Sequence, residues 1–528
     1  MVDVLIVGGG GAGLTAALAA RETGASVSVL GKSYPTRSQT CMAQGGINAA
    51  LGHAGEDSVD AHIADTLKSA QGLADEAAVA MLCGDGIAAL HWLDAIGVPF
   101  SRTEDAAIAQ RRLGGASAAR ACYAQDYSGL KILHTLYDQC NRAGIPFYNE
   151  RFLLDVLVEG GRAKGVSVLN IRTGETEVFA AKSVILATGG YSKLYGDFST
   201  NAAGSGGDGH AAALRAGARL SDMEFVQFHP TGLKSSSILI SESARGAGGH
   251  LLNGKGERFV DECLSRDRVA LAIHEQIAAG ESVWLDIRHL GEAFIDEALP
   301  QERKLARLYE GVDPVHEPMP IKPVAHYTMG GIEVDAAAQT AVAGLYAAGE
   351  CANHRVHGAN RLGGNSLLEL AIFGKRAGTK AAAFAAETAD EGKVLTAETG
   401  MTEDCFNDAP AVDFYEKREA LAALFYDKVG LVRDEAGLTQ ALEAVRTLQS
   451  QLPQMGVRDR EKVYNTNRTD FLEFVNMLTV AEAVVEGALK RKESRGAHCR
   501  SDYPAQDAAF AVHSLTCTKK EGLCFDFA

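Results

Sequence analysis

The 528-residue sequence predicts an α/β fold in which the pieces of one parallel sheet are separated by insertions. Three glycine-rich strand ends support this prediction: residues 2–13 (VDVLIVGGGGAG), 183–195 (SVILATGGYSKLY) and 344–350 (GLYAAGE). Each is a short apolar run that ends in glycine, which is typical of parallel strands whose ends meet a ligand. Between and after these pieces the composition changes, so we expect an inserted domain and a helical region.

The first piece predicts a strand, a tight turn and a helix, followed by a second strand at 26–30. Gly8, Gly10 and Gly13 form the pattern GxGxxG between strand and helix, where backbone N–H groups can face a pyrophosphate. The acidic residue that usually ends the second strand is missing, and Lys32 and Ser33 stand there instead. We expect a dinucleotide whose ribose contacts Lys32 or Ser33.

The three pieces in this order favour FAD over NAD and predict a Rossmann-like FAD-binding domain made of residues 1–215 and 341–388. Residues 216–340 are rich in His, Arg and Glu, with short strands and polar loops, and predict an inserted α+β capping domain. Residues 388–412 have the composition of a linker. Helical patterns at 413–428, 434–452 and 469–491 then predict a C-terminal helical bundle within 405–500. The periodicity of the tail, 501–528, predicts no element.

Charge and cysteine spacing exclude several classes of protein. The net charge of −16 argues against a nucleic-acid-binding surface. The ten cysteines contain no CxxC pair, so neither a zinc ribbon nor an iron–sulfur cluster nor another metal site is expected. Free thiols in a reducing compartment fit best. Residues 4–20 are uncharged but too short and glycine-rich for a membrane span, and no targeting segment is expected.

Five short segments concentrate groups that can hold a dicarboxylate. They are QFHPTG (227–232), SESARGAGG (241–249), SRDR (265–268), HYTMGG (326–331) and HGANRLGGNSL (357–367). Arginine forks, imidazoles and hydroxyls bind carboxylates well, and glycines let backbone N–H groups approach. Single residues of this kind are usually structural. We expect His229, His326, Arg266 and Arg361 to lie in Gly-, Pro- or Asn-rich loops, where functional residues concentrate.

At these motifs the chain resembles the flavoprotein subunit of succinate dehydrogenase and fumarate reductase, a family related to L-aspartate oxidase. The resemblance runs from residue 2 to about 505 and includes ESRGAHxRxDYP at 493–504. It implies that His229 and Ser241 hold one carboxylate of the substrate. His326 and Arg361 would hold the other and twist it out of conjugation, which favours hydride arrival. The family usually has Thr at the position of Ser241.

The resemblance also implies that Arg266 donates the proton and is recharged through Glu242 and Arg245. Arginine is an uncommon acid, because a guanidinium in water gives up its proton only above about pH 12. Glu242 and Arg245 are three residues apart, so they can face each other on a helix, and a purely structural ion pair is the alternative. Phe100 resembles the family's apolar wall near the substrate, or is simply a buried loop residue.

The expected FAD contacts extend beyond the first glycines. Glu350 suits a ribitol or ribose hydroxyl, or else it caps the following helix. The full expected set is Gly8, Gly10, Gly13, Lys32, Ser33, Ser38, Gln39, Thr40, Gly45, Gly46, Asp208, Glu350, Asn365, Ser366 and Leu367.

The chain departs from the family at residues 37–40, where RSQT replaces the RSHT that carries a covalently attached FAD in many members. Because Gln39 cannot form that bond, we expect non-covalent FAD. In the family the covalent bond assists succinate oxidation, so its loss favours fumarate reduction.

The resemblance implies partners as well as a substrate. The substrate would be fumarate or succinate, and electrons would come from a separate iron–sulfur subunit, with a further membrane or thiol/heterodisulfide-linked subunit. The expected location is cytoplasmic or peripheral on the inner membrane. L-Aspartate oxidase and a non-catalytic flavin electron-transfer or assembly subunit are the alternatives.

Overall fold

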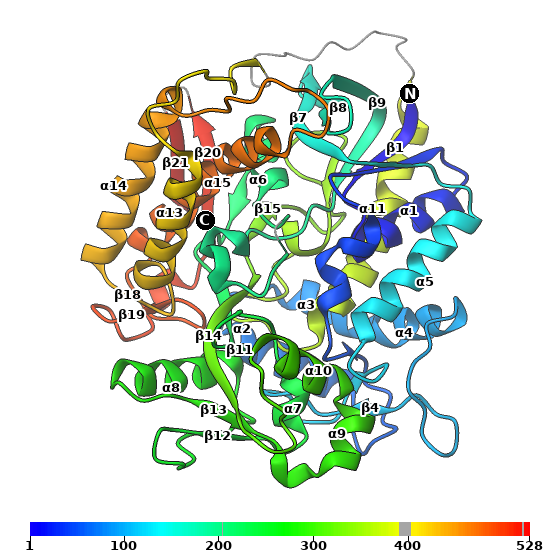
Figure 1. The fold of residues 1–528 in the computed structure, drawn as a ribbon. Coiled ribbons are helices and arrows are strands. Elements are labelled where there is room, and N and C mark those ends of the chain that lie inside the picture. Colours follow the sequence, from blue (N-terminus) through cyan, green and yellow to red (C-terminus); the bar gives the residue numbers. More distant parts are fainter. Residues whose placement is uncertain (203, 390–402, 520–521) are drawn as a thin grey trace.

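The computed structural model describes residues 1–202, 204–389, 403–519 and 522–528 (Figure 1). Most of the expected linker, residues 390–402, therefore lies outside the described residues. The fold class that the sequence predicts is confirmed: a Rossmann-like sheet with helices, a second group of strands and helices, and a C-terminal helical region.

The main sheet has seven strands in the order β6-β2-β1-β9-β8-β7, with β16 paired to β9. The strands are β1 (Val2–Val7), β2 (Val27–Gly31), β6 (Phe147–Asn149), β7 (Arg151–Glu159), β8 (Arg162–Asn170), β9 (Thr176–Leu186) and β16 (Leu345–Ala347). β6, β2, β1, β9 and β16 are parallel, and β7–β9 form an antiparallel meander. Leu186 is the register partner of both Val7 and Ala347. The three glycine-rich strand ends therefore lie side by side.

Helices cover this sheet closely. They are α1 (Gly11–Glu22), α5 (Ser128–Arg142) and α11 (Asn365–Glu387), with α2 (Val59–Ala70), α3 (Glu76–Gly84) and α4 (Gly86–Ala95) beside them. A Cβ atom at Gly374 or Gly378 would lie 2.7 or 2.2 Å from a carbonyl oxygen of α1. These glycines let α11 pack directly on α1, so the first and last pieces of the domain share one core.

One helical stretch, Glu76–Ala95, is long and apolar enough to cross a membrane by length and composition alone among the described residues. It is divided at Asp85 into α3 and α4. Residues 4–20 form β1 and α1 and are buried, which confirms that they belong to the folded protein.

The inserted segment has its own sheet in the order β11-β14-β13-β12, all antiparallel. These strands are β11 (Val226–Leu233), β12 (His250–Leu252), β13 (Trp284–Asp286) and β14 (Met319–Thr328), and the helices are α7 (Glu242–Gly246), α8 (Arg266–Ala278), α9 (Glu292–Ala298) and α10 (Pro300–Tyr309). They lie in the lower part of Figure 1. β11 and β14 have eight and ten residues, so the prediction of short strands is wrong for these two.

Two further sheets are present, and the larger one joins strands from the capping segment, the last piece of the FAD-binding domain and the tail. One has the order β17-β15-β10-β20-β21 and the other β3-β5-β4. Their strands are β3 (Ile47–Asn48), β4 (Gln110–Arg111), β5 (Ala121–Cys122), β10 (Leu220–Ser221), β15 (Gly331–Glu333), β17 (Ala352–Asn353), β20 (Ser514–Lys519) and β21 (Gly522–Phe527). The last two strands of the tail, β20 and β21, thus form a hairpin at the edge of the five-stranded sheet. Cys517 and Cys524 form a disulfide across it, which corrects the expectation that all thiols are free.

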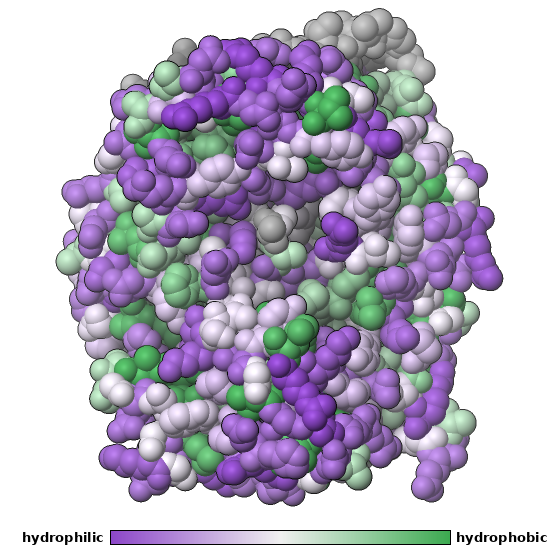
Figure 2. Space-filling model, viewed as in Figure 1, coloured by the Kyte–Doolittle hydropathy of each residue, from purple (hydrophilic) through white to green (hydrophobic). Residues whose placement is uncertain are grey.

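The C-terminal helices are α13 (Phe414–Lys428), α14 (Glu435–Gln451) and α15 (Thr466–Lys490), within a few residues of the predicted limits. The two-stranded sheet of β18 (Val432–Arg433) and β19 (Cys499–Arg500) and the helix α6 (Asp208–Arg215) lie beside them. Arg491 donates to Glu224 at 2.7 Å, and Arg495 pairs with Glu493. Arg491 also donates to Glu493 at 3.2 Å, so this arginine ties the end of α15 and the motif at 493–504 to the loop between β10 and β11. On the face seen in Figure 2, apolar side chains are scattered among hydrophilic ones.

Candidate active site

A cavity of about 720 Å³ lies where the glycine-rich strand ends meet. Its walls come from the β1–α1 turn, the loops after β9 and β16, the strands β11 and β14, and the start of α15. Its volume lies within the usual range for ligand and cofactor sites. The dinucleotide pattern and the dicarboxylate segments therefore line one continuous cavity.

The glycines of the β1–α1 turn have two different roles. Gly8 and Gly10 line the cavity at the N-terminus of α1, where free N–H groups and the helix dipole favour a pyrophosphate. Gly8 has a φ of +117°, and a Cβ there would lie 2.0 Å from the Ala187 oxygen. Gly13 does not line the cavity, and a Cβ there would lie 1.9 Å from the Gly8 oxygen. Gly13 therefore permits helix–strand packing and is not a direct contact.

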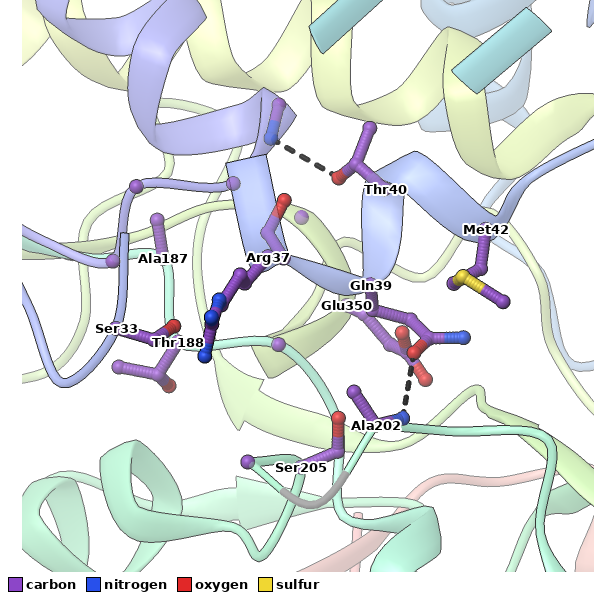
Figure 3. Close-up of a pocket in the computed structure, with 18 of the residues that line it drawn as sticks. Ser33, Arg37, Gln39, Thr40, Met42, Ala187, Thr188, Ala202, Ser205 and Glu350 are labelled. Atoms are coloured by element: carbon purple, nitrogen blue, oxygen red, sulfur yellow. Dashed lines mark hydrogen bonds between the residues drawn. The ribbon is translucent and has the colours of Figure 1, made fainter. Parts of the chain in front are cut away.

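Lys32 and Asp208 line the cavity but pair with each other. Lys32 Nζ lies 2.5 Å from Asp208 Oδ2 and 2.6 Å from Glu473 Oε1 on α15. Burial alone would lower the pKa of Lys32, but the two carboxylates raise it above its usual value. Lys32 is thus held as a cation that links the sheet to α6 and α15. Ser33 also lines the cavity (Figure 3).

The segment that replaces the family's histidine forms one wall. It consists of two 3-10 turns, η1 (Pro35–Arg37) and η2 (Gln39–Met42). Thr40 Oγ1 accepts from the Gly11 N–H at 3.1 Å, and Gln39 Oε1 accepts from the Ala202 N–H at 2.8 Å (Figure 3). Gln39 therefore joins the loop to the segment before α6. Gly45 and Gly46 line the wall after this turn.

Glu350 faces the cavity from η5 (Gly349–Cys351). Its Oε1 accepts from the Thr328 N–H at 3.0 Å, so it contacts β14 and does not cap α11. Burial raises its pKa to about 7, although the Thr328 N–H opposes this change. A carboxyl that is readily neutral suits a hydroxyl-rich ligand.

Asn365, which we expected to contact FAD, points away from the cavity. Its side chain bonds to Asn48, His62 and Thr66 in the interior, and it does not line the cavity. Ser366 and Leu367, the next two residues of α11, do line it. Asn365 is the first residue of α11, and its side chain points into the interior, where it supports the turn that precedes the helix.

Several buried polar atoms of the cavity wall lack a partner within the described protein. They are Ser38 Oγ, Gln44 Oε1, Thr188 Oγ1 and Arg361 Nε. Buried polar groups are nearly always hydrogen-bonded, so these atoms indicate a polar ligand. With the glycine turn and the helix N-terminus, they fit a flavin dinucleotide whose far end meets a second, anionic ligand.

The dicarboxylate segments meet at one end of the cavity. His229 of β11, His326 of β14, Ser241 before α7, Arg266 of α8 and Arg361 before α11 all line it. The expectation that these residues lie in loops is therefore wrong for His229, His326 and Arg266, which belong to regular elements. The two imidazole rings are 5.0 Å apart at their centroids. The antiparallel pairing of β11 with β14 places the two histidines side by side. The starts of α7 and α8 and the segment before α11 bring the other three side chains to the same cavity.

The surroundings of both histidines favour the neutral imidazole. Burial, and next the Arg266 charge, lower their pKa values well below the usual range. His229 Nδ1 accepts from the Thr231 N–H at 3.3 Å, which leaves the proton on Nε2. His326 Nδ1 lies 2.8 Å from Thr200 Oγ1. Each ring is therefore oriented by a threonine and can offer its other nitrogen to a carboxylate.

The expected proton relay is continuous. Arg266 donates to Glu242 Oε2 through Nη2 at 2.7 Å and Nε at 3.1 Å. Arg245 Nη2 lies 3.2 Å from Glu242 Oε1 on the short helix α7. Burial raises the pKa of Glu242, but Arg266 and Arg245 outweigh it and hold this pKa below its usual value. Arg245 itself is buried behind Glu242 and does not line the cavity.

One expected substrate residue lies away from the cavity, and two further residues contact Arg361. Phe100 is buried in the core beside α4 and does not line the cavity. Gln227 Oε1 accepts from Arg266 Nη1 at 3.0 Å and from Arg361 Nη2 at 3.1 Å. The Tyr327 ring lies 4.2 Å from the Arg361 guanidinium carbon. Gln227 and Tyr327 lie within the motifs QFHPTG and HYTMGG, but neither residue type by itself indicates a role in the site.

Two family models cover most of the chain. Residues 3–367 match an FAD binding domain, and residues 418–526 match the fumarate reductase flavoprotein C-term. The 8-methylmenaquinol:fumarate reductase flavoprotein subunit of Wolinella succinogenes is 39% identical over 98% of this chain and 89% of its own length. The chain belongs to the succinate dehydrogenase/fumarate reductase flavoprotein family. As expected for this family, it is an FAD-dependent oxidoreductase that acts on a CH–CH bond.

Other members agree with this assignment. The Rickettsia bellii succinate dehydrogenase flavoprotein subunit is 38% identical over 98% of this chain and 93% of its own length. A solved Escherichia coli quinol fumarate reductase superposes with a TM-score of 0.95 and 35% identity, covering 100% of this chain and 96% of that one. The described part of the chain therefore follows the family fold.

Proposed function

We propose that this flavoprotein subunit reduces fumarate to succinate in the cavity between the FAD-binding strands and the capping sheet. The observation that carries the proposal is the convergence of two neutral imidazoles, a hydroxyl and two arginines on one end of the cavity. Two opposed sets of donors match a small dianion with a carboxylate at each end. The named relatives include fumarate reductase and succinate dehydrogenase flavoprotein subunits.

Substrate orientation follows from the two sets. His229 and Ser241 would bind one carboxylate, and His326 and Arg361 the other. Arg361 has its guanidinium fixed by Gln227, Ser366 and the Tyr327 ring, so it can impose a carboxylate plane that is twisted from the alkene. Twisting removes conjugation and makes the β-carbon more electrophilic.

Bound FAD would supply the hydride to that carbon. Arg266 would give a proton to the neighbouring carbon, and Glu242 would return a proton to Arg266 across the 2.7 Å contact. Arg245 would then recharge Glu242, and solvent would return a proton to Arg245. The relay keeps Arg266 charged between turnovers, which is how a weakly acidic side chain could serve as the donor.

The flavin would be bound without a covalent link, because Gln39 is occupied by Ala202 and has no nucleophilic nitrogen to offer. Acid precipitation of the purified protein should release the yellow chromophore into the supernatant. Flavin that stays in the pellet would contradict this prediction, and a covalently flavinylated family member is the positive control.

The subunit would receive its electrons from a separate iron–sulfur subunit. In the described residues no group of three His, Cys, Asp or Glu side chains is arranged to hold a metal. The relatives that we compare are themselves named subunits. We propose a heteromeric complex, peripheral on the cytoplasmic side of the inner membrane, with the flavin chain as its catalytic part.

The decisive assay is oxidation of a reduced dye by the purified FAD-containing protein, with fumarate, mesaconate and iminosuccinate as acceptors. The dye should be oxidised fastest with fumarate as the acceptor, and the succinate formed should equal the fumarate consumed. Peroxide formation from aspartate and oxygen would indicate an L-aspartate oxidase instead. A protein that holds FAD but turns over none of these substrates would indicate a non-catalytic subunit.

A further inference from the structure

Three motif residues that take no part in the proposed chemistry form a hydrogen-bonded chain behind the two arginines. Gln227 Nε2 donates to Asn360 Oδ1 at 2.8 Å, and Asn360 Nδ2 donates to Asp267 Oδ1 at 3.0 Å. The chain ends at Gln227 Oε1, which accepts from Arg266 and Arg361. All three side chains are buried. Each member stands next to or near a substrate residue in its own motif.

The Gln227 amide has no spare hydrogen-bonding capacity. A primary amide has two N–H donors and an oxygen with two lone pairs. Gln227 Nε2 uses both donors, on Asn360 Oδ1 and on the Arg361 carbonyl oxygen, each at 2.8 Å. Its Oε1 uses both lone pairs on the two guanidinium groups. One oxygen thereby bridges two buried cations that would otherwise repel each other.

The far end of the chain decides which way the amides point. A carboxylate only accepts hydrogen bonds, so Asp267 fixes the NH2 group of Asn360 toward itself and the Asn360 oxygen toward Gln227. That oxygen in turn fixes the NH2 group of Gln227 away from the arginines. If the amides turned over, an NH2 group would face two guanidinium groups, which only donate.

We propose that Asp267 is a positioning residue that acts through Asn360 and Gln227 to hold Arg266 and Arg361 in register with the substrate. This inference rests on the proposed function, because Arg361 is the substrate grip and Arg266 the proton donor. Asp267 touches neither the cavity nor the substrate space. Its effect on catalysis passes through two amide side chains.

A structural role for Asp267 is the competing explanation. It is the acidic residue in the first turn of α8, where a negative charge stabilises a helix. The two explanations differ in one respect: a helix effect does not depend on Gln227, whereas a positioning effect vanishes once Gln227 no longer connects Asp267 to the arginines.

A double-mutant cycle on the FAD-containing protein separates them. Asp267→Asn should lower kcat for fumarate about 10- to 100-fold. An amide at position 267 can both donate and accept hydrogen bonds, so it no longer fixes which way the Asn360 amide points. In the Gln227→Ala background the same change should lower kcat by less than about twofold. Equal factors in both backgrounds would overturn the proposal. Glu275→Gln, an exposed carboxylate on α8, is the matched control for loss of charge and should leave kcat unchanged.

Binding of malonate, a dicarboxylate that cannot be reduced, provides a second readout by equilibrium dialysis. Its affinity should show the same non-additive pattern, because it depends on Arg361. If the wild-type protein binds malonate but does not reduce fumarate, the proposed function fails and the malonate cycle still decides the role of Asp267. If Asp267→Asn does not give folded protein with its FAD, Asn360→Ser breaks the chain at its middle, and its cycle with Gln227→Ala is judged by the same criterion.

Discussion

Arg266 is fixed by acceptors on two sides, Glu242 and Gln227. Both acceptors leave the rest of its guanidinium toward the cavity, which it lines. Glu242 and Gln227 thus hold the Arg266 guanidinium in place while it still faces the cavity. The proposed proton transfer to the substrate depends on this one side chain.

Arg266→Gln should therefore abolish fumarate reduction while FAD remains bound. General acid catalysis contributes about 10²- to 10⁴-fold, so we expect kcat to fall by about three orders of magnitude. The measurement is reduced-dye oxidation, with the flavin absorbance as the check on cofactor content. Activity within about tenfold of wild type, about 1.4 kcal/mol of barrier, would remove Arg266 from the mechanism.

Gly114 provides a second test at the same scale, because it makes room for the relay. A Cβ there would lie 2.4 Å from Glu242 Oε1 and 3.0 Å from the Leu264 oxygen. Gly114→Ala should displace the Glu242 carboxylate and lower kcat about 10- to 100-fold without loss of FAD. Gly84→Ala is the matched control, because nothing lies within 4 Å of its added carbon. Equal activity of the two variants would show that the relay tolerates displacement.

At the scale of elements, α10 of the capping region meets the segment before α5. The Gln301 N–H donates to Asp126 Oδ2 at 2.7 Å, and Glu302 is fully buried beside this contact. Burial, and next the Asp126 charge, raise the pKa of Glu302 to about 8. A buried carboxyl at this junction makes the contact between the two regions sensitive to pH.

Glu302→Gln should stabilise the protein at alkaline pH. Between pH 4.5 and about 8 the carboxyl is neutral in the folded protein and ionised in the unfolded chain, so stability falls as pH rises and the loss is complete above about 8. Glutamine escapes this loss. The melting temperature of the variant should exceed that of wild type by several degrees at pH 9 and match it near pH 4.5. Glu297→Gln, an exposed carboxylate on α9, should show no such difference.

Elements also show where the sequence was informative. The helices at 414–428 and 435–451 follow the apolar periodicity, and the first strand and helix follow the glycine turn. The tail hairpin escaped prediction because its partner strand, β10, lies almost 300 residues earlier. Sequence periodicity cannot supply a pairing whose register depends on so distant a strand. The Cys517–Cys524 pair depends on that hairpin and escaped with it.

The same distinction holds for the site. Motif residues with chemical side chains, such as His229 and Arg361, could be predicted to line it. The turn of Asn365 into the interior, the removal of Phe100 from the cavity and the mutual pairing of Lys32 with Asp208 depend on backbone direction and packing. Those properties arise only when separate segments fold together.

On the scale of the whole molecule, the cavity exists because three strand ends of one sheet meet a separate antiparallel sheet. The FAD-binding strands supply the dinucleotide end, and β11 and β14 supply the imidazoles. Lys32 joins these strands to α6 and α15, and Arg491 joins the helical region to the β10–β11 loop. Both ends of the cavity are therefore fixed by contacts between regions that are distant in sequence.

The most direct test is a crystal structure of the FAD-containing protein with bound malonate or fumarate. We predict that one carboxylate contacts His229 and Ser241, that the other contacts His326 and Arg361, and that the ligand lies against the flavin with Arg266 beside its central carbon. A dicarboxylate bound outside this cavity, or one within it that leaves either pair of side chains without contact, would contradict the account.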